Sequence, residues 1–211
     1  VDEENQIACT DCHDAQLTHS DERILSHLET VACETCHIPE GALRDPTKMN
    51  WDWSQAGDAN REENEHEYLK IKGEFVYESN FQPEYFWFNG VAERYLLGDP
   101  IAEEGTTVLN QPLGDRDDST ALISPFKVHR ARQPYDTEYN ILLQPNTVGP
   151  EGYWTTFDWD SALERGSQVA GIPYSGNYGF ADTEMYWNLA HMVQPKENAL
   201  QRTDCHSEDG R

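Results

Sequence analysis

The chain has 211 residues and a formal net charge of −24, from 39 acidic and 15 basic side chains. This charge excludes nucleic acid and anionic lipid surfaces as partners, because both repel an acidic protein. The sequence contains no run of 18 apolar residues, which predicts that it does not insert into a membrane.

Residues 1–45 are predicted to form short helices and loops that carry two copies of the pattern Cys-x-x-Cys-His. The copies are Cys9-Thr10-Asp11-Cys12-His13 and Cys33-Glu34-Thr35-Cys36-His37. Two thiols three positions apart lie on one helical turn and can add to the two vinyl groups of a porphyrin. The next residue, a histidine, then faces the iron as its proximal ligand. The pattern therefore predicts two covalently attached c-type haems.

A zinc ribbon is the main alternative for these cysteines, because two Cys-x-x-Cys pairs with this separation also occur in zinc sites. A four-thiolate zinc site needs neither His13 nor His37, although both follow their pairs directly. A disulfide framework explains these histidines no better. Haem is therefore favoured over zinc and over disulfides.

The next segments are expected to contain little regular structure. Residues 46–75 are polar and charged without clear periodicity, which indicates a loop. Residues 75–145 alternate aromatic clusters with Gly and Pro turns, and a few short strands are expected there. Helices are predicted over 160–170, closed by Gly171 and Pro173, and over 183–193, ending before Pro195.

The C-terminal segment repeats part of the first motif. It reads Arg202-Thr203-Asp204-Cys205-His206, so Arg202 stands where the first cysteine of the pattern would be. One thioether through Cys205 and one ligand at His206 can still hold a haem, so a third haem is possible. The alternative is a decayed site in which Cys205 is free or pairs with another chain.

The remaining histidines are candidates for the second axial position of each iron. Electron-transfer haems usually have both axial positions filled. The candidates are His19, His27, His129 and His191, whereas His66 lies in a polar run and is expected to be solvated. Histidines in excess of the haems could bind a haem in a neighbouring copy or in a partner chain.

Ile, Leu, Val and Phe number only 39, which is few for a folded chain, yet 6 Trp and 10 Tyr are present. Because disordered chains are poor in aromatic residues, we expect porphyrin to complete the core. The predicted fold is mostly irregular, with short α-helices and few β-strands, packed around stacked haems. We expect a single domain over 1–211, in which 1–45 attaches haem and 46–211 packs against haem and supplies distal ligands.

Beyond the haem motifs, the chain resembles the C-terminal half of the octahaem cytochromes of the tetrathionate reductase family. The segments that carry the resemblance occur in the same order over almost the whole chain. They are 30–39, 46–53, 85–90, 92–98, 125–129, 152–159, 185–187 and 191–196. The resemblance implies that His129 and His191 are distal ligands, and that a third haem motif lies at 202–206, where Arg202 departs from it. The reductase activity of that family resides in the N-terminal half, to which nothing here corresponds.

The predicted function is electron transfer between bis-histidine haems, without catalysis of its own. Because c-type haem is attached outside the cytoplasm, an extracellular or periplasmic location after removal of a leader is expected. Expected partners are redox proteins and other copies of the chain, as in extracellular cytochrome filaments, which we prefer to a soluble shuttle. The alternative is part of a reductase of oxidised sulfur or nitrogen compounds. That alternative needs one haem with an open or lysine-bound position, with Lys127, Lys196 and the Cys205 site as the places to look.

Overall fold

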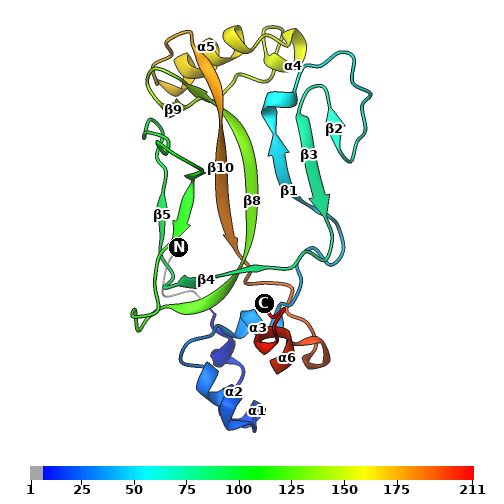
Figure 1. The fold of residues 1–211 in the computed structure, drawn as a ribbon, viewed down its shortest axis with the longest axis vertical. Coiled ribbons are helices and arrows are strands. Elements are labelled where there is room, and N and C mark those ends of the chain that lie inside the picture. Colours follow the sequence, from blue (N-terminus) through cyan, green and yellow to red (C-terminus); the bar gives the residue numbers. More distant parts are fainter. Residues whose placement is uncertain (1–6) are drawn as a thin grey trace.

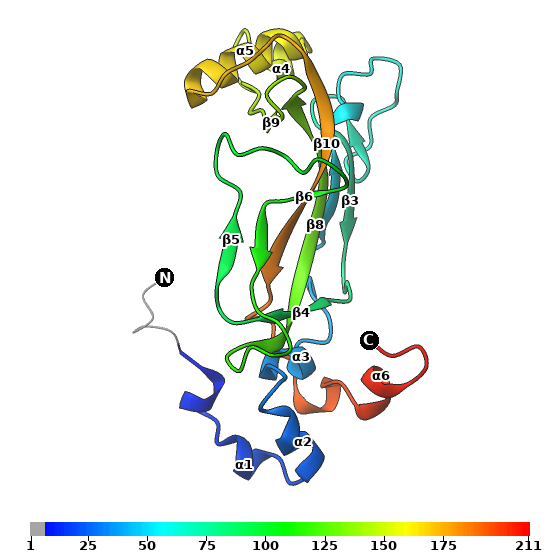
Figure 2. The same ribbon diagram turned by 60° about the vertical axis from the view of Figure 1, so that its left-hand side comes forward.

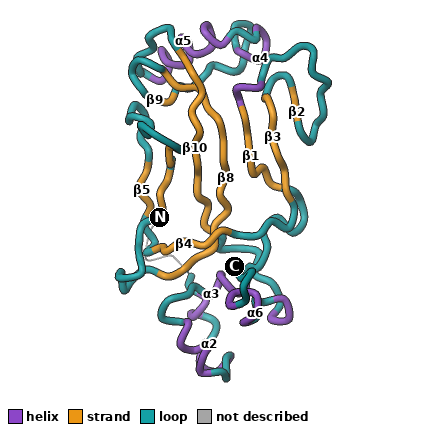
Figure 3. Tube along the Cα trace, viewed as in Figure 1, coloured by secondary structure: helices purple, strands orange, loops and turns teal. Residues whose placement is uncertain are grey.

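The computed structural model describes residues 7–211. A long twisted sheet separates two helical ends, as Figure 1 and the secondary-structure colouring of Figure 3 show. The described residues begin and end in the lower helical part, which consists of residues 7–40 and 194–211 and is called the lower lobe below. Segments far apart in the sequence therefore meet there.

Most strands belong to one sheet, whose order is β2-β3-β1-β8-β10-β6, and β4 and β9 also pair with β8. Strands β5 and β7 form a separate two-stranded sheet beside it, seen most clearly in Figure 2. The bounds are β1 Thr47–Asp52, β2 Tyr68–Leu69, β3 Gly73–Glu78, β4 Glu84–Phe88, β5 Ala92–Arg94, β6 Thr107–Val108, β7 Asn110–Pro112, β8 Leu122–Asp136, β9 Ile141–Leu142 and β10 Tyr178–Asn188.

The sheet is larger than predicted, and the expectation of a mostly irregular fold with few strands is wrong. Residues 46–75, expected to be a loop, contain β1, β2 and the first half of β3. The side chains of β1 and β3 do not alternate cleanly between apolar and polar, which is why the pattern indicated a loop. Antiparallel pairing with β3 and parallel pairing with β8 nevertheless satisfy the β1 backbone.

The helix predicted over 183–193 is also wrong, because β10 extends to Asn188 and pairs along its whole length with β8. Thr183 and Tyr186 favour an extended backbone, and pairing with a 15-residue strand stabilises it further. His191 consequently lies in the loop after β10 and not on a helix.

The upper end is formed by α4 (Tyr153–Thr156) and α5 (Trp159–Ala170), which confirms the helix predicted over 160–170. Asp158 caps α5 through the Ser161 N–H, and Gly171 ends the helix in the left-handed conformation with φ 71°. Tyr153 stacks on Trp159 with ring centroids 3.9 Å apart. This end is therefore closed by its own side chains.

The lower lobe contains short helices, as predicted for the N-terminal segment. They are η2 Cys9–Asp11, α1 Ala15–Thr18, α2 Glu22–His27, α3 Cys33–His37, η4 Lys196–Asn198 and α6 Arg202–His206, while η3 Trp53–Gln55 follows β1 in the sheet. A small core cluster of Ile38, Ala42, Phe81 and Leu189 joins the lobe to the sheet. No helix among the described residues is long and apolar enough to cross a membrane. The single-domain organisation stays a prediction.

Candidate functional site

The second Cys-x-x-Cys-His motif forms α3, which is hydrogen-bonded to the start of β8. The Ala32 N–H donates to the Ile123 carbonyl at 3.0 Å, and the Thr35 hydroxyl donates to the same carbonyl at 2.7 Å. The Ile123 N–H in turn donates to the Thr30 carbonyl. Thr35, one of the two residues between the cysteines, therefore anchors the attachment helix to the sheet and leaves Cys33 and Cys36 half-buried beside it.

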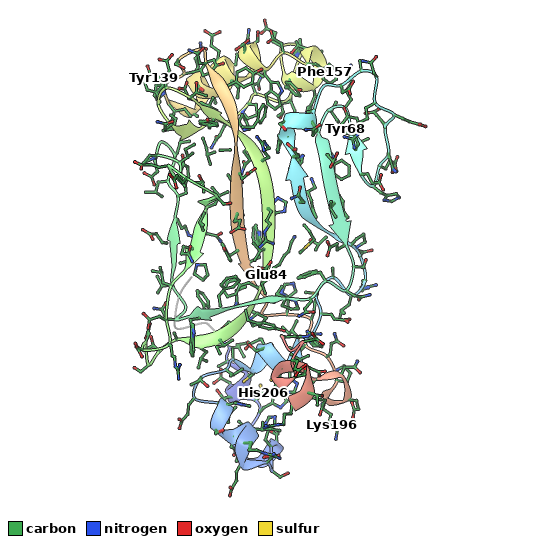
Figure 4. The ribbon with its side chains drawn as sticks, in the orientation of Figure 1. Tyr68, Glu84, Tyr139, Phe157, Lys196 and His206 are labelled. Atoms are coloured by element: carbon green, nitrogen blue, oxygen red, sulfur yellow. The ribbon has the colours of Figure 1, made fainter. Side chains whose placement is uncertain are left out.

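The C-terminal motif lies against α3. The Gln194 N–H donates to the His37 carbonyl and the Leu200 N–H to the Cys36 carbonyl, each at 2.9 Å. Arg211 also donates to the Pro39 carbonyl at 2.5 Å. These bonds hold α6 next to α3, and Figure 4 shows His206 in the lower lobe. The motif with Arg202 thus adopts a five-residue helix of the same length as α3.

None of the five cysteines forms a disulfide with another. The Cys9 thiol lies 3.7 Å from the Glu34 carboxylate. Burial, together with Glu34 and the neighbouring Cys33, raises the pKa of Cys9 to about 11. Burial also raises the pKa of Cys36, and Cys205 and Cys33 add to that effect. The structure therefore brings thiols of all three motifs into one neighbourhood, with Cys33 near Cys9 and Cys36 near Cys205.

Two pairs of histidines face each other in the lower lobe. The His19 and His37 ring centroids lie 6.2 Å apart, and the His27 and His206 centroids lie 6.0 Å apart. Imidazoles that bind one metal from opposite sides, each through a bond of about 2 Å, place their centroids about 6 Å apart. Both centroid separations are close to that value. In each pair, one histidine directly follows a cysteine of a motif, His37 or His206. The other is His27 of α2 or His19, which lies in the turn before α2.

The hydrogen bonds of two predicted distal ligands prepare them to bind a metal. Nδ1 of His19 lies 3.1 Å from the Ala15 carbonyl, and Nδ1 of His129 lies 3.1 Å from the Lys48 carbonyl. A carbonyl can only accept, so Nδ1 carries the proton and the Nε2 lone pair stays available. Burial lowers the pKa of His129; the hydrogen bond to the Lys48 carbonyl opposes this effect, and the charges of Lys127 and Lys48 add to it.

Several predicted site residues are not brought together. Among residues 7–211, no second imidazole makes a ring contact with His13, His129 or His191. His129 lies on β8, six residues beyond the α3 contact at Ile123, which is roughly 20 Å along an extended strand. His191 is exposed in the loop after β10, and His66 is exposed as predicted.

The lower lobe lacks the packing that its helices need by themselves. No residue of η2, α2 or α6 is buried, and Ile7 and Ile24 are 85% and 44% exposed. Apolar side chains and unpacked helices next to thiols and paired imidazoles fit a large apolar group that carries a metal. The residues present therefore fit haem, and they fit zinc poorly because no group of three or more His, Cys, Asp or Glu among the described residues is arranged to hold a bare metal ion.

Sequence reasoning missed the contact that orients His129. The Lys48 carbonyl comes from β1, which had been expected to be part of a loop, and the two residues are 81 positions apart. No local pattern could reveal this contact, because it depends on the parallel pairing of β1 with β8.

The fold and site define a multihaem c-type cytochrome whose cofactor is haem c. The chain belongs to the bacterial cytochrome c family, whose model, described as "Cytochrome c bacterial", matches residues 48–209. It is also similar to the crystal structure of an octahaem cytochrome c from Shewanella oneidensis, with 46% sequence identity and a TM-score of 0.92. That match covers 98% of this chain but 49% of the octahaem chain, so this chain spans about half its length. No curated protein matches the chain.

Proposed function

We propose that the chain transfers electrons through haems that each have two histidine axial ligands. The observation that carries this proposal is the separation of about 6 Å within the pairs His19–His37 and His27–His206. Haem c supplies an iron that changes between the ferrous and ferric states. Two imidazoles fill both axial positions and leave none for a substrate, which restricts the chemistry to electron transfer.

Each attachment motif has a separate role in this proposal. Cys9 and Cys12 form thioethers beside the proximal ligand His13, and Cys33 and Cys36 do so beside His37. The thiols of the two motifs approach each other through Cys9 and Cys33. This proximity supports short distances between the two haems.

A third haem at Cys205 and His206 completes the set. The five-residue helix α6, its position beside Cys36, and the pairing of His206 with His27 all support a working site in spite of Arg202. A decayed site would not be expected to keep the His27 imidazole 6.0 Å from that of His206. A single thioether and two axial bonds attach this haem.

The histidines without an imidazole partner support ligation across polypeptides. Within residues 7–211, no second imidazole makes a ring contact with His13, His129 or His191. We propose that His129 and His191 bind irons held by other polypeptides, and that copies of the exported chain assemble into a filament. Because such a contact joins different surfaces of the two molecules, repetition generates an open chain of subunits.

Intact mass and imaging of one native preparation test the proposal. Three haems per chain in long filaments are the expected result. Two haems in a small particle would overturn both the single-thioether site and the filament, and would leave a smaller electron carrier.

One observation favours a second candidate, part of an octahaem-type reductase of oxidised sulfur or nitrogen compounds. An iron bound by His13 alone would keep an open position for a substrate. Lys127 is less suited to bind this iron, because the Lys127 ammonium donates to the Thr47 hydroxyl at 2.6 Å. Lys196, the other candidate, lies in η4. A high-spin ferric signal in the isolated protein would favour this candidate.

A further inference from the structure

The segment after α6 folds back on that helix. The Arg211 N–H donates to the Asp204 carbonyl of α6 at 2.8 Å. Gly210 passes so close to the Cys205 carbonyl that a Cβ at this position would clash with it. This close approach requires glycine, and it fixes where Arg211 lies relative to α6. Residues 207–211 are called the return turn below.

The return turn carries the Arg211 guanidinium to two other parts of the fold. Nη1 of Arg211 donates to the carbonyl of Pro39, a buried residue two positions after His37 of α3. The same nitrogen donates to the Tyr85 hydroxyl of β4 at 3.4 Å. Among residues 7–211, no ion pair includes Arg211, so its guanidinium bonds to neutral oxygens. One side chain therefore links the return turn to α3 and to the sheet.

These contacts lie beside thiols of the second and third motifs. Burial raises the pKa of Tyr85, the Arg211 guanidinium opposes this effect, and the Cys205 and Cys36 thiols add to it. Burial and Asp204 raise the pKa of Cys205, and Arg211 again opposes the rise. The guanidinium is therefore close to the cysteine that would carry the third haem.

Few contacts of its own hold α6 in place. None of its residues is buried, and Arg202 stands where a first cysteine would add a second thioether. The backbone bond from Leu200 to α3 holds the segment before α6, whereas Arg211 holds the segment after it. His206, the last residue of α6, lies between these two anchors and faces His27. A shift of α6 would therefore move one imidazole of this pair away from the other.

We propose that Arg211 is a positioning residue for the third haem and takes the place of the thioether that is missing at Arg202. Its bonds to α3 and β4 hold α6 so that His206 stays opposite His27. This inference rests on the third haem proposed above. Hydrogen bonds from a charged donor are stronger than neutral ones, which suits a guanidinium to this restraint. Arg211 thus supplies noncovalently what the first cysteine supplies in the other two motifs.

The test measures how readily cyanide replaces an axial imidazole in the oxidised, haem-loaded chain. Cyanide reaches an iron with two imidazole ligands only after one of them dissociates, so each such iron gives a slow phase of binding. In His27→Ala, the slow phase of the iron at His206 should become fast, which identifies that phase. We expect Arg211→Gln to accelerate this phase alone, by about tenfold or more, because hydrogen bonds from a charged donor are lost.

Further variants distinguish positioning from a general loss of structure. Arg211→Lys keeps a cationic donor and should restore most of the slow phase. Arg202→Cys combined with Arg211→Gln should also restore it, because a second thioether makes the restraint from Arg211 dispensable. Arg165→Gln is the matched control, since the Arg165 guanidinium pairs with Glu151 at the upper end, and its cyanide kinetics should equal those of the wild type.

The number of haems and the kinetics together decide the outcome. Three haems in the wild type with unchanged kinetics in Arg211→Gln overturn this inference and leave the proposed electron transfer intact. Acceleration that Arg202→Cys does not reverse shows that Arg211 does not replace the thioether, and acceleration of every slow phase shows general unfolding. Either result overturns the inference. Only two haems in the wild type overturn the third haem, and the role of Arg211 with it.

Discussion

His27 and His206 face each other with ring centroids 6.0 Å apart and planes inclined by 16°, although they come from opposite ends of the chain. The Asp21 cap holds α2, which carries His27, and backbone bonds from Leu200 and Gln194 hold α6 against α3. The fold thus closes one candidate metal site from two distant segments. The pair forms only because the C-terminal segment returns to the lower lobe.

Removal of His27 should change the spin state of a single haem. In His27→Ala, we expect one iron per chain to lose its sixth ligand and become high-spin, because no other imidazole lies opposite His206 among residues 7–211. Electron paramagnetic resonance of the oxidised protein measures this change. His66→Ala, an exposed histidine outside the lower lobe, is the matched control and should leave the spectrum unchanged. An unaltered spectrum in His27→Ala would contradict the pairing.

The thioether at Cys205 should be the only covalent link of the third haem. Cys205→Ser is expected to lower the intact mass under denaturing conditions by one haem, whereas Arg202→Cys should keep three haems and create a second link. The pyridine haemochrome spectrum counts the remaining vinyl groups, and we expect one fewer in Arg202→Cys. If Cys205→Ser keeps the wild-type haem mass, the single-thioether site is ruled out.

The haem chemistry could be predicted from the sequence because it depends on local spacing. The pattern around Cys9 and Cys33 places thiols and histidine on one turn whatever the rest of the chain does. The α5 helix could also be predicted from local signals, because Asp158 precedes it and Gly171 follows it. The same reasoning identified His19 and His27 as candidate ligands but could not pair them, because the pairs depend on how the N-terminal segment packs on α3 and α6.

The sheet was underestimated because its strands are stabilised by one another. The segment around Tyr186 reads equally well as a helix that ends before Pro195, and only the register with β8 decides between the two. Polar residues such as Asn50 and Arg132 lie in strands because their backbones pair with a neighbouring strand. The pattern of a single segment does not reveal this pairing. Tertiary pairing overrode local preference at both places.

Gly166 on α5 should be irreplaceable for a steric reason. A Cβ at this position would lie 1.6 Å from the Gln144 carbonyl oxygen. Alanine normally stabilises a helix by about 1 kcal/mol relative to glycine, but overpacking costs about 1–3 kcal/mol. We therefore expect Gly166→Ala to lower the free energy of unfolding, as measured by denaturant titration followed by circular dichroism. Val169→Ala, at a side chain that is 90% exposed on the same helix, should have little effect. Stabilisation by Gly166→Ala would show that the helix sits farther from Gln144.

Asp136 should make the upper end of the sheet sensitive to acid. Its carboxylate is fully buried and accepts from the N–H groups of Glu138, Tyr139 and Ser175 at 2.6–2.9 Å, and also from the Ser175 hydroxyl. Burial raises the pKa of Asp136, but these donors outweigh it and the net pKa lies below the ordinary value.

Because the pKa is lower in the folded state, the carboxylate stabilises the fold above its unfolded pKa of about 3.9. This contribution is lost as pH falls through the lower folded value. We expect Asp136→Asn to cost about 1–3 kcal/mol at pH 7, since an amide NH₂ would face backbone donors. The difference from wild type should shrink below about pH 4. Denaturant titrations of both proteins between pH 3 and 7 measure it, with Asp182→Asn, an exposed carboxylate on β10, as the control. A difference that stays constant over this range would mean that the ionised form of Asp136 does not stabilise the sheet.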